Sequence, residues 1–434
     1  MTGAEPRWGG VFGWRVRALA RRGGYRLLDR LRPPDPGARI KAAETALRNR
    51  PGPVRIGFVV CNPAKWSAGP LFARLARDPA FEVSLHVTLS DVALRLPRAQ
   101  RREDFRRVSA FFEMIGPLGP PLYDATTDRM QPEAQIGVDL AVIQQPWGMQ
   151  DLPRRLLKGG ILSAYLHYGY PIIRNDGMQF GLPDFHRYLW AYIAASDWHG
   201  KMAMSGPAPP YQVIVAGYPK LDIYLSPAPA RNAVPHWSHP GQAGRKRVIF
   251  APHHTLDSTL KMGTFDWSGP TMLELVRSYP QVDFLLKPHP NLRAEMHRRG
   301  AARAFADWLD AWQAAPNTAQ FEAGNYFDLF RSSDLMITDS GSFLAEYLPT
   351  GHPILRLCRA DSAPMNTAGR ALVPAFYTAD TADELRRAFE RILIRGQDPL
   401  AELRSELARR VLPQEGGSAE VVTRYLRCKL ASKG

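Results

Sequence analysis

The chain has 434 residues, of which 45% are hydrophobic and 22% are charged, and its formal net charge at pH 7 is +15. This composition excludes a disordered protein, and the length is sufficient for two domains with cores of their own. The three cysteines lie far apart without CxxC or Cys/His ligand spacing, so neither a disulfide framework nor a zinc site is indicated, and a reducing cytoplasm fits. No apolar run reaches the roughly 18 to 20 residues of a membrane span, and the N-terminus lacks the apolar core of a signal peptide. We therefore expect a protein that is neither integral to a membrane nor exported.

Residues 1–50 form a basic leader, with twelve Lys or Arg residues against four Asp or Glu residues. Between Arg7 and Leu31 the basic residues alternate with aromatic and aliphatic ones. This pattern predicts an amphipathic helix over residues 7–32 that lies on an anionic membrane surface. A solvated arm is the alternative. Nucleic acid is not an expected partner, because no recognisable nucleic-acid module accompanies the charge.

Residues 51–225 read as a first Rossmann-like domain. A short helix over 40–48 precedes it. Apolar runs predict buried parallel strands, and helical stretches over 69–77 and 95–112 return the chain between them, which gives the βαβαβ order typical of this fold. The predicted strands cover 54–61, 81–89, 138–144, 161–165, 190–196 and 213–216.

Two loops of this domain follow predicted strands and carry polar side chains. His167 lies in a Gly/Pro-rich loop with Gly169, where an imidazole could reach a ligand and act as a general base. A loop histidine satisfied by the backbone is the alternative. The second loop, 217–222, follows the last strand.

The composition shifts to Pro, Gly, Ala, His and Arg without periodicity over 226–245, which we interpret as the interdomain linker. A second domain over 246–412 begins with strands at 247–251 and 282–286, separated by a helix over 269–279. Further strands are expected at 335–337 and 354–357, and further helices at 382–394 and 403–410. A closing helix at 419–430 lies in the C-terminal segment 413–434.

The strand at 335–337 ends in Asp339-Ser340-Gly341-Ser342, which can open a helix running to about Leu348. The unpaired N–H groups and hydroxyls of such a turn favour a phosphate, at the edge where open α/β sheets bind ligands. A packed helix with an ordinary cap is the alternative.

The loop Lys287-Pro288-His289-Pro290 holds a cation and an imidazole rigidly after another strand, which favours a charged contact there. A turn with exposed charge is the alternative. No metal site is predicted at His253-His254, because adjacent side chains usually point apart and no carboxylate follows at ligand spacing.

Six blocks in order, AYLHYGYPI, AGYPKLD, VIFAPHHT, FLLKPHP, SDLMITDSGSFLAEYLPTGHPIL and EGGSAEVV, resemble the CDP-glycerol:poly(glycerophosphate) glycerophosphotransferases, the teichoic acid polymerase and primase family. The resemblance covers roughly residues 160 to 425. It implies a GT-B fold, with two Rossmann-like α/β domains that face each other across a cleft.

The resemblance also implies site residues. His167 and His289 would be catalytic. The donor phosphates would be held around Thr338, Asp339, Ser340, Gly341 and Ser342, with Lys287 and the acidic Glu346 nearby. Possible substrate loops contain Gly169, Gly217, Lys220, Asp222, His253 and His254. The sequence departs from the family pattern at Leu166, Tyr168 and Tyr170, and again at Ser340, Gly341 and His253-His254.

The implied function is transfer of glycerol phosphate, or a related alditol phosphate, from CDP-glycerol to a hydroxyl of a lipid-linked or polymeric glycan acceptor, releasing CMP. No cofactor is expected, and the enzyme would work peripherally at the cytoplasmic face of the membrane in teichoic acid-like or capsule synthesis. A GT-B glycosyltransferase or UDP-sugar 2-epimerase-like enzyme is one alternative. A non-catalytic, membrane-attached glycan-binding module is another.

Overall fold

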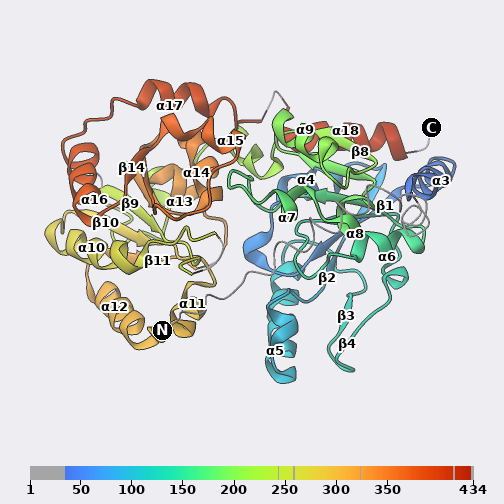
Figure 1. Cartoon of the computed structure of the whole chain (residues 1–434), viewed down its shortest axis with the longest axis horizontal. Coiled ribbons are helices and arrows are strands. Elements are labelled where there is room, and N and C mark those ends of the chain that lie inside the picture. Colours follow the sequence, from blue (N-terminus) through green and yellow to red (C-terminus); the bar gives the residue numbers. More distant parts are fainter. Residues whose placement is uncertain (1–34, 243, 258–259, 323, 414–415, 432–434) are drawn as a thin grey trace, which may run out of the picture. The chain divides into compact units, whose positions relative to one another are not determined.

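The computed structural model describes residues 35–242, 244–257, 260–322, 324–413 and 416–431. The predicted membrane-binding segment, residues 7–32, lies outside them. Among the described residues, no helix combines the length and the hydropathy needed to cross a bilayer. Two parallel sheets of six strands, each covered by helices, confirm the expected pair of Rossmann-like domains (Figure 1).

The first sheet has the strand order β2-β1-β5-β6-β7-β8, and all of its pairings are parallel. Its central strands are nearly continuous apolar runs, because helices cover both faces of such a sheet, whereas the edge strands β2 and β8 are partly exposed. The strands are β1 (Val54–Val60), β2 (Phe81–Val87), β5 (Leu140–Ile143), β6 (Leu162–Leu166), β7 (Ala191–Ala194) and β8 (Gln212–Val215). The helices are α3 (Gly37–Arg48), α4 (Gly69–Leu75), α5 (Arg98–Glu113), α6 (Leu152–Lys158), α7 (Asp176–Phe180), α8 (Pro183–His186) and α9 (Asp197–Ser205), and a small hairpin pairs β3 (Tyr123–Asp124) with β4 (Arg129–Met130).

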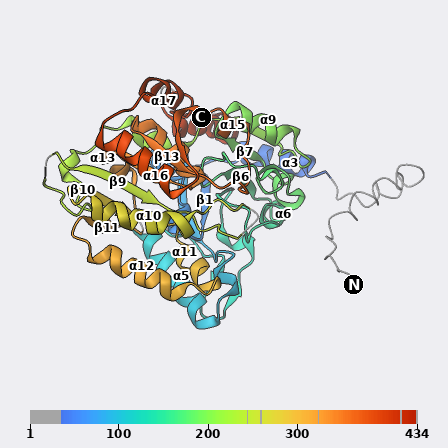
Figure 2. The ribbon, with the colours of Figure 1, turned by 60° about the vertical axis from the view of Figure 1, so that its left-hand side comes forward.

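The second sheet has the order β11-β10-β9-β12-β13-β14, again parallel throughout. Figure 2 shows this sheet from another side. Its strands are β9 (Lys246–Ala251), β10 (Val282–Leu286), β11 (Thr318–Gln320), β12 (Leu335–Thr338), β13 (Ile354–Leu357) and β14 (Tyr377–Ala379). The helices are α10 (Phe265–Ser278), α11 (Leu292–Arg298), α12 (Ala302–Ala314), α13 (Phe327–Ser332), α14 (Gly341–Tyr347), α15 (Thr367–Arg370), α16 (Ala382–Phe389) and α17 (Ala401–Ala408).

The segment 226–245 is packed against the second domain, although its sequence has no periodicity. Trp237 is buried and donates its indole N–H to Ser332 Oγ at 2.9 Å, and the Arg231 guanidinium pairs with Asp334 at 2.5 Å. The chain then returns to the first domain through α18 (Ser418–Leu430), whose Val422 and Leu426 belong to the first core.

Candidate functional site

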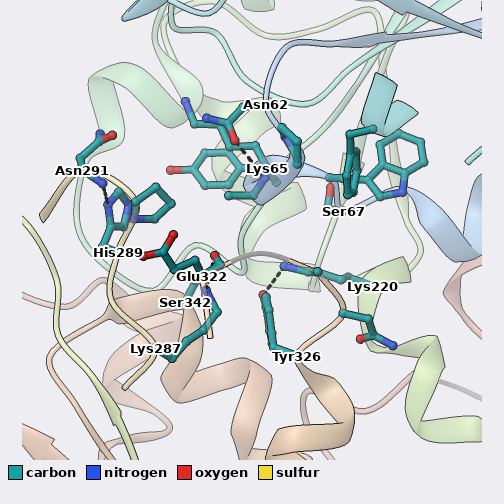
Figure 3. A pocket seen from close by; sticks show the side chains of 18 of the residues that line it. Asn62, Lys65, Ser67, Lys220, Lys287, His289, Asn291, Glu322, Tyr326 and Ser342 are labelled. Carbon is teal, nitrogen blue, oxygen red and sulfur yellow. Dashed lines mark hydrogen bonds between the residues drawn. The ribbon is translucent and has the colours of Figure 1, made fainter. Parts of the chain in front are cut away.

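A cavity of about 700 Å³ lies between the loops that follow the strands of the two sheets (Figure 3). The first domain contributes the loops after β1, β2, β6 and β8. The second contributes the loops after β9 and β10, the loop before α13 and the start of α14. Ligands of open α/β sheets bind at this carboxyl edge of the strands. The polar side chains on the wall include Asn62, Lys65, Asp91, Lys220, Lys287, His289, Asn291, Glu322, Ser340, Ser342 and Glu346.

Lys287 is a poorly solvated cation on the cavity wall. Its side chain is 6% exposed, and its ammonium faces the rings of Phe321, Tyr326 and Phe343 at 5.4 to 5.9 Å. The one hydrogen bond recorded for it within the described part of the chain is to the backbone oxygen of Glu322, at 3.5 Å. Burial, with repulsion from Lys220, lowers the pKa of Lys287 to about 8. A group of this kind gains strongly from an anion in the cavity.

Three imidazoles gather beside this lysine. The ring centroids of His254 and His289 lie 3.9 Å apart, and those of His253 and His254 lie 4.6 Å apart. The expectation that the adjacent side chains of His253 and His254 point apart is therefore wrong. It assumed extended backbone, whereas these residues lie in a turn closed by the His254 carbonyl, which accepts from the Leu256 N–H at 2.9 Å.

The three histidines offer ring nitrogens within 4.8 Å of one another, a spacing that invites a metal ion. The hydrogen bonds of two of them, His253 and His289, favour another ligand. Nδ1 of His253 accepts from the Thr255 N–H at 3.3 Å, and Nδ1 of His289 accepts from the Asn291 N–H at 3.1 Å. A neutral ring whose Nδ1 accepts carries its proton on Nε2, whereas a metal ligand at Nε2 needs that lone pair free and usually donates from Nδ1. Burial lowers the pKa of His253 to about 3 and that of His289 well below its usual range, so both rings are neutral donors at pH 7.

The Asp339 to Ser342 turn is tied to the second sheet. The Asp339 carboxylate accepts from the His253 N–H at 2.5 Å and the Thr264 N–H at 2.6 Å. These two bonds hold the turn against the loops that follow β9. Burial raises the pKa of Asp339 to about 7. Thr338 Oγ1 donates to the Ala251 carbonyl at 2.7 Å. Ser340 and Ser342 line the cavity.

A buried ion pair joins the two domains at the cavity wall. Lys220, after β8, lies 3.3 Å from both carboxylate oxygens of Glu346 in α14. Tyr326 OH donates to Glu346 Oε2 at 2.5 Å and accepts from Lys220 Nζ at 2.5 Å. The structure thus brings together Lys220 and Glu346, which the sequence placed in separate motifs. The two side chains bind each other.

His167 lies beside the cavity but does not line it. Its imidazole is 9% exposed and packs among the rings of Tyr165, Trp147 and Tyr168. Nδ1 accepts from the Gly169 N–H at 3.2 Å, and burial lowers the pKa of His167 to about 3. The loop itself approaches α14, because a Cβ on Gly169 would lie 3.2 Å from Ser342 Cβ. A catalytic role for His167 stays a prediction.

The remaining predicted loop residues, Gly217 and Asp222, serve α18. The Asp222 carboxylate accepts from the backbone N–H groups of Ser418 and Ala419 at 2.8 and 2.7 Å. Gly217 has a φ of +85° and approaches Ser418 closely, a position that no other residue adopts without strain.

Several polar cavity residues escaped the sequence analysis, and two charged ones, Lys65 and Asp91, lie close together. Lys65 Nζ lies 5.5 Å from the Tyr168 ring and 3.9 Å from Asp91 Oδ1, and both residues line the cavity. Their signal was positional. Each follows one of the first two predicted strands, at the edge where ligands bind, but neither belongs to a motif.

No family model matches the chain, and no curated protein matches it. Solved structures do. The S. aureus MnaA structure with UDP has a TM-score of 0.58 at 13% identity, over 88% of this chain and 100% of its own. The Neisseria meningitidis UDP-GlcNAc 2-epimerase bound to UDP-GlcNAc has a TM-score of 0.56 at 16% identity, over 86% of this chain and 99% of its own. The Methanocaldococcus jannaschii UDP-GlcNAc 2-epimerase with UDP-GlcNAc and UDP has a TM-score of 0.53 at 12% identity, over 86% and 100%.

These comparisons overturn the resemblance to CDP-glycerol glycerophosphotransferases, and with it the prediction of glycerol phosphate transfer from CDP-glycerol. The blocks that carried the resemblance are loops at the strand ends, such as Ser340 to Ser342 and Lys287 to Pro290. Their chemistry suits a diphosphate but says nothing about the base attached to it. The fold that the chain shares with the epimerases is GT-B-like.

Proposed function

We propose that the chain is an enzyme that binds a uridine diphosphate sugar in the cavity between its two domains. Lys287 carries the proposal, because it is a buried cation on the cavity wall with no ion pair among the described residues. The fold neighbours were solved with UDP or UDP-GlcNAc, which supports the uridine nucleotide.

The diphosphate would lie against the second domain. Lys287 would supply the positive charge, and the neutral His289 would donate from Nε2 without adding charge. The hydroxyls of Ser340 and Ser342 face the same space. Donors held in place by backbone hydrogen bonds lose little freedom on binding and strengthen as charge moves to the leaving diphosphate.

Replacing Lys287 by Met keeps much of the side-chain volume and removes the charge. We expect UDP to raise the melting temperature of the wild-type protein, and K287M to weaken UDP binding at least tenfold in calorimetry, which corresponds to about 1.4 kcal/mol. Lys158→Met removes an equal charge from an exposed position at the end of α6, so its UDP affinity should equal that of the wild type.

Comparing UDP, UDP-GlcNAc, CDP, CMP and inorganic diphosphate tests the nucleotide. We expect the two uridine nucleotides to bind most tightly. The absence of any melting shift with UDP or UDP-GlcNAc would refute the proposed function, and equal binding of UDP and inorganic diphosphate would restrict the site to phosphate recognition and remove the uridine assignment.

A further inference from the structure

One side of the cavity has a character that a sugar nucleotide does not explain. Six side chains of the first domain, from the loops after β1 and β2, from α4 and α5 and from the turn after α5, form what we term the apolar wall. Two of its members are unusually open for large aliphatic residues, Val92 at 51% and Ile115 at 39% exposure. The apolar wall consists of Trp66, Pro70, Val92, Leu96, Phe111 and Ile115.

The apolar wall has a fixed foundation. Trp66 packs edge-on against Phe58, Phe72 and Phe112, with ring centroids 5.5 to 6.0 Å apart. Pro70 belongs to α4 and Phe111 to α5, Ile115 follows the end of α5, and two more wall residues flank the tight turn after β2. The wall is therefore a preformed apolar surface that opens into the cavity, as expected of a ligand site.

The Asp91 carboxylate lies at the edge of the apolar wall, beside Lys65. Asp91 precedes Val92 of the wall, and its Oδ1 is buried without a hydrogen bond from any described residue. The nearest cation is Lys65, whose Nζ lies 3.9 Å from that oxygen, beyond hydrogen-bonding distance. Lys65 in turn precedes Trp66 of the wall. Oδ1 is an acceptor without a donor, and the Asp91 side chain is 31% exposed, so a ligand hydroxyl in the cavity can reach this carboxylate.

The turn that carries Asp91 is fixed in place. Ser90 Oγ accepts from the Ala93 N–H at 3.0 Å and Ser90 O accepts from the Leu94 N–H at 2.9 Å. Gly148, at a φ of +77°, lets a second loop press against this turn, because a Cβ there would lie 3.1 Å from the Asp91 nitrogen. The backbone that carries the Asp91 side chain is thus held in place on two sides.

We propose that Asp91 is the general base of a glycosyl transfer, and that the apolar wall holds the hydrocarbon tail of the acceptor alcohol. This rests on the proposed function. The acceptor oxygen forms a bond to the anomeric carbon of the UDP-sugar while the bond from that carbon to the β-phosphate oxygen breaks and its electron pair leaves with UDP. The hydroxyl proton passes to the Asp91 carboxylate, and Lys65 neutralises the local negative charge before transfer.

The occupant is an amphiphile because the two ends of this subsite differ in chemistry. The wall is apolar, and the described charged groups that line the cavity beside α5, Asp104 and Arg107, already pair with each other at 2.5 Å. The polar end meets Asp91 and Lys65. An enzyme that only isomerises a sugar nucleotide has no second substrate to place there.

Octyl β-glucoside, below its micelle concentration, and methyl β-glucoside present the same hydroxyls with and without a tail. We expect the octyl compound to bind to the UDP-loaded protein and to increase UDP release from UDP-GlcNAc at least fivefold, while the methyl compound does neither at equal concentration. Asp91→Asn should abolish the increase and retain both UDP and octyl glucoside binding.

Ile115→Asp should weaken octyl glucoside binding at least fivefold, whereas Met204→Asp, at a 50% exposed position of α9 outside the cavity lining, should not. Octyl and methyl glucoside behaving alike, or an Asp91→Asn variant with undiminished release, would overturn this inference. If the wild-type protein binds UDP but no amphiphile, the acceptor subsite is refuted and the proposed function stands. If it binds no UDP, the proposed function itself is refuted.

Discussion

His199 ties the start of α9 to the loop 170–175 through its two ring nitrogens. Nδ1 accepts from the Ser196 hydroxyl at 2.7 Å, and Nε2 donates to the Pro171 carbonyl at 2.7 Å. Asn366, from the second domain, donates to the same carbonyl at 2.8 Å. Burial lowers the pKa of His199 to about 4, so the ring is neutral and its two hydrogen bonds have a fixed direction.

This environment predicts a pH dependence of stability. Between pH 6.5 and about 4 the unfolded chain binds a proton at this imidazole that the folded chain does not bind. The free energy of unfolding therefore includes the full contribution of the neutral His199 above pH 6.5. It falls as the pH drops below that value, by up to about 1.4 kcal/mol per pH unit for one group. His199→Asn should be less stable than the wild type at pH 7.5 and should lose less stability on acidification to pH 5.

Urea denaturation at the two pH values measures the difference. His297→Asn, at an exposed position of α11, is the matched control and should follow the wild type at both values. Equal pH slopes for wild type and the His199 variant would contradict the expected titration.

At this scale the sequence identified residue types better than side-chain directions. Lys287, His289, Ser340 and Ser342 were chosen from loops at strand ends, Lys220 and Glu346 were carried over from the family resemblance, and all six line the cavity. His167 came from the same kind of loop, but its ring turns into an aromatic cluster supplied by other strands and loops. Asp91 and Lys65 belong to no motif, and only the three-dimensional neighbourhood of the cavity singles them out.

Among the elements, α15 and the loop 170–175 form a close joint between the domains. The Asn366 N–H donates to the Ile172 carbonyl and the Arg174 N–H to the Pro364 carbonyl, both at 2.9 Å. A Cβ on Gly369 would lie 2.4 Å from that Ile172 oxygen, a distance that forces backbone to move. Glycine at this position therefore sets how closely the two domains approach.

Gly369→Ala should destabilise the protein by about 1 to 3 kcal/mol, because the added methyl group overpacks a backbone contact. Gly177→Ala has open space around the new Cβ and should leave the melting temperature nearly unchanged. Thermal denaturation of the two variants checks this. A Gly369→Ala protein with wild-type stability would contradict this prediction, because it would show that the contact between α15 and the loop 170–175 can accommodate a methyl group.

Most strands and helices followed from local patterns, since long apolar runs and Gly/Pro boundaries are local properties. The helix α12 was missed although Phe305, Trp308, Leu309 and Trp312 have helical spacing and are buried, so its signal was present in the sequence. The helix α10 begins four residues before the predicted Gly269 and contains Pro270 in its interior. The packing of 226–245 depends on Trp237 and Arg231 meeting distant partners, which composition cannot reveal.

For the whole molecule, the Lys220–Glu346 pair is the charged contact that ties the domains beside the cavity. Both side chains are at most 10% exposed, so removing one partner leaves a buried charge uncompensated. Glu346→Gln and Lys220→Met should each cost about 3 to 5 kcal/mol of unfolding free energy, and the double variant should cost less than the sum.

A double-mutant cycle by urea denaturation measures that coupling. Arg303→Met breaks an exposed ion pair with Asp307 and should change stability by less than about 1 kcal/mol. Additive losses for Lys220 and Glu346 would mean that each side chain is held by its other neighbours, Tyr326 and Tyr218 among them.

The helix α18 has a consequence for how the cavity can open. Because α18 packs in the core of the first domain, the described chain passes between the domains twice, just before the segment 226–245 and near the turn at Gly416 and Gly417. A domain that is linked to its neighbour at two places rotates most easily about the line through those two places. Opening and closing of the cavity should therefore be a single hinge rotation of the second domain about that line. A twist of one domain against the other would have to stretch one of the two connections.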